Sequence, residues 1–543
     1  MRRLRFLPAA VLAVVFSAIV GGLLGGSVLA RQDEVSQHYR LFTAALNAVE
    51  NEYVEKVESD RLVYSSIDGM LRTLDPHSSF LDPRTYAQLR ERQEGRYYGL
   101  GISILPVEGD ITVMSIFEGS PAYKKGLRRG DVIAKIEGQD AKGWTNDQAV
   151  RKLRGPKGTQ VNISIKRQGH EGLIDLTIER DEINILTVLG AFMVDEERGY
   201  VRVREFSETT DDELGRALEA LRAKGLKKLV LDLRDNPGGP LDQAIRVANR
   251  FLPRGELIVY TRGRVPNADQ NYRATERSEY TDMPVVVLVN RNSASASEIV
   301  AGALQDHDRA LVVGETTFGK ALVQSIYRIS NQAGLALTTG RYYTPSGRLI
   351  QRPWDGSFDE YLTYTLRDQQ LNSEKPHAAA ELKYTDTGRK VYGGGGIEPD
   401  RHIAGSVEGF NPSRFGRMLV ARQMFENYAE KFSAEGDNRI VGGSAGRKTV
   451  RRGFDVTDEM VAEFKASLVK ERLKVDEAAF AKDADFIRAM IHLQIDNALF
   501  GIEEARRNLI ERDPMAQTAL SLFPEAEKLM AAGRSKTTQM RQR

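Results

Sequence analysis

The stretch Pro284-Val285-Val286-Val287-Leu288-Val289 is a run of strand-forming residues, and Asn292-Ser293-Ala294-Ser295-Ala296-Ser297-Glu298-Ile299 follows it closely. Apolar residues then recur at helix spacing from Ile299 to Leu304. The sequence therefore predicts a buried strand, a serine-rich junction and a helix. A serine at such a junction lies where backbone N–H groups are free to stabilise an anion.

A candidate base, Lys320, follows some twenty residues later in Thr317-Phe318-Gly319-Lys320. Serine is a poor nucleophile without a base. The lysine amine has an ordinary pKa near ~10.4, and burial can lower that pKa by about 3–5 units. The apolar neighbours Ala321-Leu322-Val323 favour burial, and Gln324 is placed to orient the amine. These residues predict a serine–lysine hydrolase.

Three serines compete for the role of nucleophile: Ser293, Ser295 and Ser297. Each of them is also suited to cap the following helix. Chemistry alone does not choose among them.

Composition narrows the class of protein. A chain of 543 residues is too long for one core, so several domains are expected. The net charge of +2 gives no field that would attract nucleic acid. Cysteine is absent, which excludes disulfides, a thiol nucleophile and cysteine ligands. The seven histidines form no His-Glu-x-x-His motif, so no metal and no cofactor is predicted.

The N-terminus indicates export. Arg2, Arg3 and Arg5 precede an uncharged stretch from Phe6 to Ala30. Residues 1–30 have the features of a cleaved signal peptide, and the stretch is also long enough to be a membrane anchor. Both alternatives place the body of the protein on the periplasmic side of a bacterial inner membrane, with the arginines left inside.

The pattern along the rest of the chain predicts a multidomain α+β fold. Near-continuous apolar strands alternate with amphipathic helices in residues 181–410, which indicates an α/β sheet covered on both faces. Residues 31–95 form a predicted helical region, and residues 96–180 are short strands with glycine turns. Residues 411–543 are a helical extension with a basic tail, expected to be disordered over its last ten residues. The predicted helices of that extension are 414–432, 458–473, 477–500 and 502–511.

Residues 96–180 resemble a PDZ domain. The similarity is carried, in order, by Gly99-Leu100-Gly101-Ile102, Gly119-Ser120-Pro121-Ala122 and Leu127-Arg128-Arg129-Gly130-Asp131-Val132-Ile133. The resemblance implies that N–H groups of the first glycine loop receive a terminal carboxylate and that the next strand accepts the peptide as an added strand. The helix that starts near Thr145 would line the groove. Thr145 and Gln148 predict its capping box.

A second resemblance covers residues 36–405 and is to the carboxy-terminal processing peptidases, also called tail-specific proteases. It implies a PDZ domain between the N-terminal helical region and the α/β protease core. Six segments carry it: Asp68-Gly69-Met70-Leu71, Leu74-Asp75-Pro76-His77-Ser78, Asp232 to Gly239, Asn290 to Gln324, Arg341 to Arg348 and Gly396 to Asp400.

This family resemblance implies roles for individual residues. Ser295 is the implied nucleophile, Lys320 the general base and Gln324 its supporting side chain. The N–H groups of Ala296 and of Gly239, with Gly238 as second choice, would form the oxyanion hole. The chain departs from the family at Ala321, where glycine is usual, and a positive φ there would strain an alanine.

Arg154, at the end of the predicted PDZ helix, has two alternative roles. Because the PDZ domain gates the active site in the resembled family, the resemblance implies that Arg154 couples peptide binding to the alignment of Ser295 and Lys320. The alternative is an arginine that satisfies the last carbonyl groups of its own helix.

The sequence supports an exported serine endopeptidase that captures protein or peptide C-termini on its PDZ domain and cuts with a Ser–Lys dyad. Expected partners are such substrates, an envelope adaptor or regulator, and further copies of the chain. The alternative is an envelope PDZ scaffold with an inactive core. A third hypothesis pairs Ser295 with His307 and either Asp306 or Asp308, but a helix of twelve residues would separate the serine from the histidine by roughly 18 Å.

Overall fold

The computed structural model describes residues 36–542 except 118, 168, 277, 330–332, 355–360, 362, 364–376 and 437–449. The predicted signal or anchor at residues 1–30 lies outside this range. Among the helices that are described, none has the length and apolarity that crossing a membrane requires. The described residues form two compact units: residues up to Asp82 with Ile326–Leu337, and Pro83–Ser325 with the chain from Thr338 onward.

The first unit is small and mostly helical, as predicted. Residues 36–52 are helical, and α2 spans Ser59–Leu71. The turn after α2 is held by the Asp75 carboxylate, which accepts hydrogen bonds from the N–H groups of His77 and Ser78, both at 2.8 Å. Strand β1, Ser79–Leu81, then pairs antiparallel with residues 334–336.

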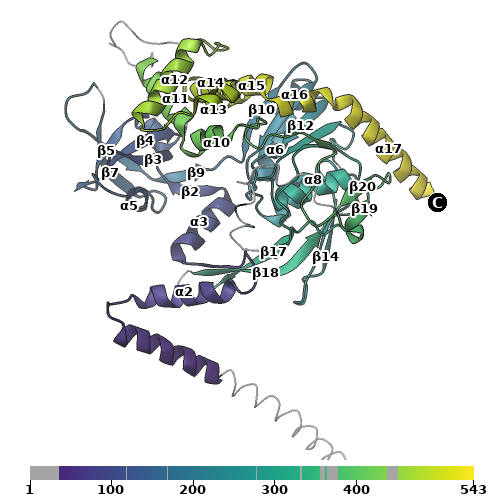
Figure 1. Cartoon of the computed structure of the whole chain (residues 1–543), viewed down its shortest axis with the longest axis horizontal. Coiled ribbons are helices and arrows are strands. Elements are labelled where there is room, and N and C mark those ends of the chain that lie inside the picture. The colour runs from purple at the N-terminus through teal and green to yellow at the C-terminus, as the bar shows by residue number, and fades with distance from the viewer. Residues whose placement is uncertain are drawn as a thin grey trace, which may run out of the picture. The chain divides into compact units, whose positions relative to one another are not determined.

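The PDZ domain is a six-stranded antiparallel sheet with two helices (Figure 1). Helix α5 begins at the predicted capping box, since Thr145 and Gln148 bond reciprocally. Strands β2 and β9 pair with each other where the chain enters and leaves the domain. The elements are β2 Arg96–Gly99, β3 Ile102–Val107, β4 Asp110–Ile116, α4 Pro121–Lys124, β5 Val132–Ile136, β6 Gln139–Asp140, α5 Asn146–Leu153, β7 Gln160–Lys166, β8 Ile174–Glu179 and β9 Asp181–Asn184.

The protease core is built on a six-stranded sheet in the order β10-β11-β12-β15-β16-β21. Only β10 is antiparallel to its neighbour, and the other pairs are parallel. Its elements are β10 Val188–Met193, β11 Arg198–Val203, α6 Thr210–Ala223, β12 Lys228–Asp232, α7 Leu241–Asn249, β15 Val285–Val289, α8 Ala296–Asp306, β16 Leu311–Gly314 and β21 Arg401–His402.

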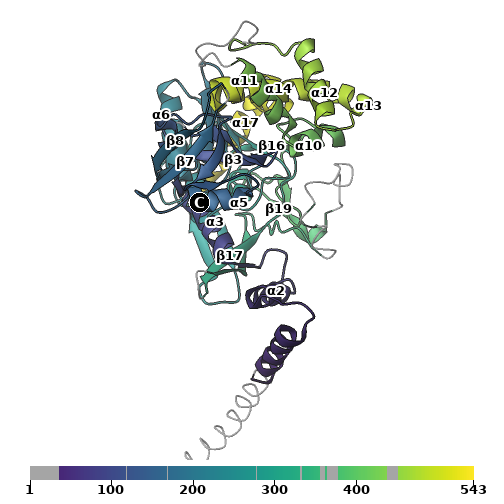
Figure 2. The same ribbon diagram turned by 90° about the vertical axis from the view of Figure 1, so that its left-hand side faces the viewer.

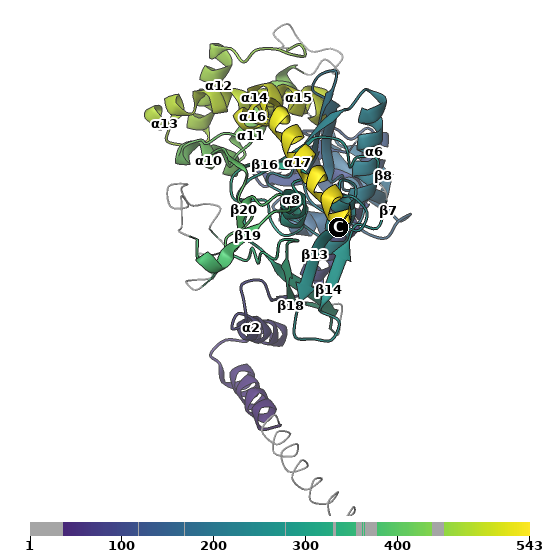
Figure 3. The ribbon, with the colours of Figure 1, turned by 90° about the vertical axis from the view of Figure 1, so that its right-hand side faces the viewer.

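Both faces of this sheet are covered, as the continuous apolar strands predicted. Successive residues of a strand point to opposite faces. In β15, Val285 and Val287 pack with helices α6 to α8, whereas Val286 and Leu288 join a cluster with Met515 and other residues of the C-terminal helices. Those helices, α16 and α17, run along the sheet (Figure 3). The C-terminal extension is therefore the second layer of the core.

A second sheet contains β13 Leu257–Arg262, β14 Gln270–Arg273, β17 Leu322–Arg328 and β18 Gly334–Tyr343. Helix α3, Pro83–Glu94, leads into the PDZ domain. A hairpin of β19 Leu382–Tyr384 and β20 Lys390–Tyr392 follows the 3-10 turn Ala379–Glu381.

Helices α10 to α15, which lie together in Figure 2, share a separate hydrophobic core. They are α10 Arg414–Ala421, α11 Met424–Gly436, α12 Asp458–Lys470, α13 Glu477–Lys482, α14 Ala484–Phe500 and α15 Ile502–Arg512. Helices α16 Pro514–Ser521 and α17 Phe523–Gln542 belong instead to the cluster under the sheet.

Three predictions for this region were wrong. Residues 414–432 form two helices because Gln423 takes a left-handed φ of 55°. Residues 477–500 also form two, separated at Asp483, whose carboxylate accepts hydrogen bonds from the N–H groups of Ser413 and Gly416. The tail expected to be disordered continues helix α17 as far as Gln542.

Phe523→Ala should destabilise the core by about 3–5 kcal/mol, because Phe523 is 2% exposed in the cluster under the sheet. Chemical denaturation followed by circular dichroism measures the change. Val469→Ala is the control, since that side chain is 63% exposed on α12. Equal stability of the two variants would contradict the assignment of α17 to the core.

Candidate active site

Ser295 lies at the first turn of α8, where the chain leaves the central strand β15. Its φ of 56° and ψ of −111° form a sharp turn that few non-glycine residues adopt. The side chain is half-buried. A strained backbone at this position is held by surrounding contacts, and those contacts define the site.

The other two serines of the motif are occupied. Ser293 Oγ donates to the carbonyl of Leu233 at 2.8 Å and accepts from Asn290 N–H at 2.9 Å. Ser297 Oγ donates to the carbonyl of Asn236 at 3.1 Å. Ser295 Oγ, by contrast, makes no hydrogen bond within the described part of the chain.

Lys320 lies in the loop between β16 and β17 and is half-buried. Its Nζ donates to Gln324 Oε1 at 2.9 Å, the pairing expected from their spacing. The left-handed residue of this loop is Gly319, with φ 85°, whereas Ala321 does not take a positive φ. The alanine is therefore unstrained in this backbone.

One carboxylate, that of Glu298, joins the two loops. Its Oε2 accepts from the N–H groups of Ser295 at 2.7 Å and Lys320 at 2.9 Å. Its Oε1 accepts from the N–H of Gly319 and the hydroxyl of Thr317, both at 2.6 Å. Glu298 is completely buried. Burial raises its pKa to about 7, although the four hydrogen bonds act in the opposite direction.

Tyr342, on β18, makes a second bridge between the loops. Its single hydroxyl hydrogen is shared between the carbonyl of Lys320 and, at 3.2 Å, the carbonyl of Ser295. Burial raises the pKa of Tyr342 well above its ordinary value, so the hydroxyl remains a donor. The backbones of Ser295 and Lys320 are thus tied together twice.

The loop after β12 approaches Ser295 closely. A Cβ on Gly238, with φ 96°, would lie 2.8 Å from Ser295 Cβ and 2.9 Å from Ala296 N. Gly239, with φ 154°, would bring a Cβ against the carbonyl of Phe206. Both positions therefore require glycine.

The N–H groups near Ser295 differ in availability. Gly238 N–H donates to Asn236 Oδ1 at 2.9 Å. The N–H groups of Gly239 and Ala296 have no hydrogen-bond partner among the described residues. Ala296 directly follows Ser295, and Gly239 directly follows Gly238, which approaches Ser295 closely. Unoccupied N–H groups are the donors that an oxyanion hole requires.

In the PDZ domain, the loop Gly99-Leu100-Gly101-Ile102 connects β2 to β3. Gly101 has φ 76°, and a Cβ there would clash with Ser120. The carbonyl of Leu100 accepts from Ala122 N–H at 3.0 Å, which fixes the loop against α4.

Arg154 does not serve its own helix. Arg180 donates to the last carbonyls of α5, those of Leu153 at 3.0 Å and Lys152 at 2.8 Å. The Arg154 guanidinium instead pairs with Glu91 on α3 and lies 4.4 Å from the centroid of the Tyr97 ring. The alternative of a carbonyl-satisfying arginine was wrong.

His307 ends α8 at the opposite terminus from Ser295. Its Nδ1 bonds to Asp386 Oδ2 and its Nε2 to the carbonyl of Leu257, both at 2.7 Å. Asp306 and Asp308 pair with Arg348 and Arg389. The hypothesis of a Ser–His–Asp triad through His307 is therefore wrong. Within the described ranges His307 also belongs to a cluster with Glu256 and Asp386 whose ligand atoms lie within 4.8 Å of one another, but both ring nitrogens already have protein partners.

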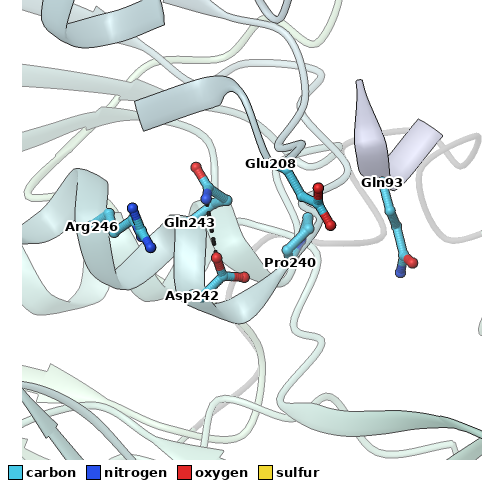
Figure 4. A pocket seen from close by; sticks show the side chains of 6 residues that line it. All are labelled: Gln93, Glu208, Pro240, Asp242, Gln243 and Arg246. Carbon is cyan, nitrogen blue, oxygen red and sulfur yellow. Dashed lines mark hydrogen bonds between the residues drawn. The ribbon is translucent and has the colours of Figure 1, made fainter. Parts of the chain in front are cut away.

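A polar pocket of about 360 Å³ opens beside the loop after β12. Figure 4 shows Gln93 facing the first turns of α7 across it. Its lining residues are Gln93, Glu208, Pro240, Asp242, Gln243 and Arg246. Pro240 directly follows Gly239, so the pocket begins where the glycine loop ends.

Sequence reasoning missed Glu298 and Tyr342. The spacing Ser295-x-x-Glu298 is a capping-box pattern, and it contained a signal for the carboxylate. No local pattern pointed to Tyr342, because its partners lie 47 and 22 residues away.

Comparison with known proteins agrees with this arrangement. A model of peptidase family S41 matches residues 197–355, and a PDZ domain model matches residues 88–166. A model of the N-terminal domain of the activating protease CtpB matches residues 27–85. The carboxy-terminal-processing protease of Bartonella bacilliformis is 43% identical over 307 residues, which are 56% of this chain and 70% of that protein.

The chain belongs to the carboxy-terminal processing peptidases, serine peptidases of family S41. A second relative, the carboxy-terminal processing protease CtpA of Bacillus subtilis, is 35% identical over 351 residues, 64% of this chain and 74% of the relative. The solved photosystem II D1 C-terminal processing protease is 32% identical, with a TM-score of 0.32, covering 56% of this chain and 88% of that one. This peptidase therefore combines the S41 core with a PDZ domain.

Glu298→Gln should lower kcat by about 10- to 100-fold. The amide NH₂ would face N–H groups that now donate hydrogen bonds to the carboxylate, and this repulsion would displace the loops. In the wild-type peptidase, activity should fall as the pH drops through about 7, where Glu298 gains a proton. The part of this acid limb that is due to Glu298 should be absent from the residual activity of Glu298→Gln, whereas the requirement for a neutral general base remains. An unchanged limb would contradict this role.

The same group links stability to pH. The folded-state pKa of Glu298 lies above its ordinary value of 4.5. Its contribution to the free energy of unfolding is therefore largest below about pH 4.5 and declines by about 3 kcal/mol as the pH rises to 7. Glu213→Gln is the matched control, since its buried carboxylate also accepts from N–H and hydroxyl donors, those of Thr187 among them. It should lose stability but retain kcat.

Proposed function

We propose that the peptidase cleaves by a Ser–Lys dyad mechanism. Lys320 Nζ, in its neutral form, takes the proton of Ser295 as Oγ attacks the carbonyl carbon of the scissile bond. The N–H groups of Ala296 and Gly239 stabilise the oxyanion. Lys320 then gives the proton to the leaving amine, and water hydrolyses the acyl-enzyme with Lys320 again as base.

The observation that carries this proposal is the position of Glu298. A single buried carboxylate binds the N–H groups of both Ser295 and Lys320, so the nucleophile and base are oriented by one group. Gln324 accepts from Lys320 Nζ at 2.9 Å, which directs the amine. Ser293 and Ser297 have buried partners for their hydroxyls, which leaves Ser295 for chemistry.

For the oxyanion hole, the hydrogen bond from Gly238 N–H to Asn236 supports Gly239 as donor and makes Gly238 the supporting glycine. The close approach of Gly238 to Ser295 brings the loop to the reacting centre.

We further propose that the PDZ domain selects substrates by their C-termini, with the loop Gly99-Leu100-Gly101-Ile102 receiving the terminal carboxylate and β3 receiving the peptide. Arg154 lies beside this loop, since a Cβ on Gly99 would be 3.5 Å from Arg154 Cγ. An arriving carboxylate would compete with Glu91 for the Arg154 guanidinium.

A chain of contacts leads from Arg154 toward the glycine loop after β12. Glu91 lies on α3, and the carbonyl of Gln93 on the same helix accepts from Glu208 N–H at 2.8 Å. Two residues earlier, Phe206 N–H donates to the carbonyl of Gly238 at 2.9 Å. This path supports Arg154 as the residue that couples PDZ occupancy to Ser295 and Lys320.

The peptidase is also proposed to act outside the cytoplasm, on the periplasmic side of the inner membrane, on the basis of Arg2, Arg3, Arg5 and the uncharged stretch from Phe6 to Ala30. Homo-oligomers and an envelope adaptor belong to the same proposal. The alternative function, a PDZ scaffold with an inactive core, differs from it in lacking hydrolysis.

Ser295→Ala and Lys320→Ala should each abolish hydrolysis of a disordered model protein with a free C-terminus, because nucleophile and base are both required. Labelling of the wild-type serine by a fluorophosphonate should disappear in Ser295→Ala. Surface variants Ser164→Ala and Lys227→Ala are the controls. An intact chain that neither hydrolyses nor labels would favour the scaffold.

Arg154→Ala should reduce the preference for a substrate with a free C-terminus over its C-terminally amidated form by about tenfold, for loss of one charge-assisted contact, whereas Glu91→Ala should raise this preference because the competing carboxylate is gone. Steady-state kinetics on the matched pair of substrates measures this ratio. Arg84→Ala is the control, because Arg84 also joins α3 to α5, through Asp147, but at an exposed site. An unchanged ratio in both variants would rule out this coupling.

A further inference from the structure

The C-terminal helices contribute a charged group to the loop that carries Gly239. Arg234 lies two residues after the end of β12 and is 1% exposed. Its guanidinium is shared by two carboxylates. Asp232 Oδ2 lies 2.6 Å from Nη2, and Asp513 Oδ2 lies 2.7 Å from the same nitrogen.

Asp513 is placed for this contact by its own helix. It is the N-cap of α16, and its Oδ1 accepts from the N–H groups of Met515 at 3.0 Å and Ala516 at 3.1 Å. This leaves Oδ2 directed at Arg234. The carboxylate is completely buried, and a Cβ on Gly409 would collide with it, so Gly409 packs directly against Asp513.

A second route runs through Glu408, in the segment between β21 and α10. Its carboxylate pairs with Arg506 on α15 and, at 3.1 Å, with Arg202 on β11. Arg202 Nη2 in turn donates to the carbonyl of Arg234 at 3.4 Å and to Asp235 Oδ2 at 3.2 Å. The backbone and side chains at the start of the loop are thus both bound by this network.

The loop after β12 has a backbone conformation with several unfavourable φ angles. Asp235, Gly238 and Gly239 have φ values of 57°, 96° and 154°. Asp235 also receives hydrogen bonds from the side chains of Asn290 and Asn292, both at 2.8 Å, beside the nucleophile motif. A conformation of this kind persists only when its surroundings fix it.

We propose that Asp513 and Glu408 are positioning residues for the oxyanion hole, so that the C-terminal helical region is part of the catalytic apparatus. Asp513 acts through Arg234, and Glu408 acts through Arg202. Neither side chain touches substrate. This inference rests on the proposed role of Gly239 N–H as an oxyanion donor.

Removal of the Asp513 charge leaves Arg234 paired with one carboxylate, that of Asp232. The guanidinium would then be free to shift and take the loop with it. A misplacement of about 1 Å at a reacting centre costs about 100-fold in rate. Substrate binding by the PDZ domain, which this network does not contact, would be unaffected.

The test compares the full-length Asp513→Asn variant with wild type, because the amide keeps Oδ1 for the helix cap and removes the charge. We expect kcat to fall by about 10- to 100-fold with KM and the pH profile unchanged. The affinity of a peptidyl boronate, which mimics the tetrahedral intermediate, should fall by the same factor. Asp476→Asn is the matched control, since Asp476 caps α13 in the same region without facing a charge.

Two results would overturn the inference. One is a folded Asp513→Asn with kcat within twofold of wild type. The other is a loss of kcat without loss of boronate affinity, which would indicate a purely structural effect. Should Asp513→Asn not fold, Glu408→Gln decides in the same assay. Loss of activity in Ser295→Ala together with normal kinetics in both charge variants would refute this inference alone, whereas activity in Ser295→Ala would refute the proposed dyad.

Discussion

The buried carboxylate of Glu298 is the interaction on which the active site depends. Ser295 has a φ of 56°, which is costly, and Lys320 lies in a loop. Neither conformation is imposed by a regular element. The carboxylate accepts from both backbones, and an acceptor with four donors is strongly favoured over the same donors left unpaired in a dry interior. Its pKa near 7 follows from this burial, so its ionisation is linked to the geometry it maintains.

The central sheet explains why this arrangement can be rigid. Parallel strands buried on both faces need a helix layer on each side. Helices α6 to α8 provide one layer, and α16 with α17 provide the other. The second layer comes from sequence far from any catalytic motif. Because α16 packs against β15 and β16, its N-cap residue, Asp513, can reach Arg234 at the start of the glycine loop.

Much of this fold followed from local pattern. The capping box at Thr145 and Gln148, the buried strand at β15 and the helix after Ser295 are encoded within a few residues. The breaks at Gln423 and Asp483 were not visible, because a left-handed residue and a long-range carboxylate contact interrupt helices whose periodicity continues. In the site, the pairing of Lys320 with Gln324 followed from spacing, whereas Tyr342 and Asp513 act across contacts that only the folded chain creates.

The glycine loop after β12 is where these separate parts of the chain meet. Phe206, which lies on the path to α3 and Arg154, donates its N–H to the loop. At the start of the loop, Arg202 donates to the carbonyl of Arg234, and these two arginines pair with Glu408 and Asp513. The carbonyl of Asn236, within the loop, accepts from Ala294 N–H at 2.9 Å, next to Ser295. A loop that must keep its hydrogen bonds with Phe206, Arg202 and Ala294 has few alternative backbone conformations. A disturbance at any one contact therefore changes the position of Gly239 N–H more readily than that of the Ser295 backbone, which Glu298 and Tyr342 hold independently.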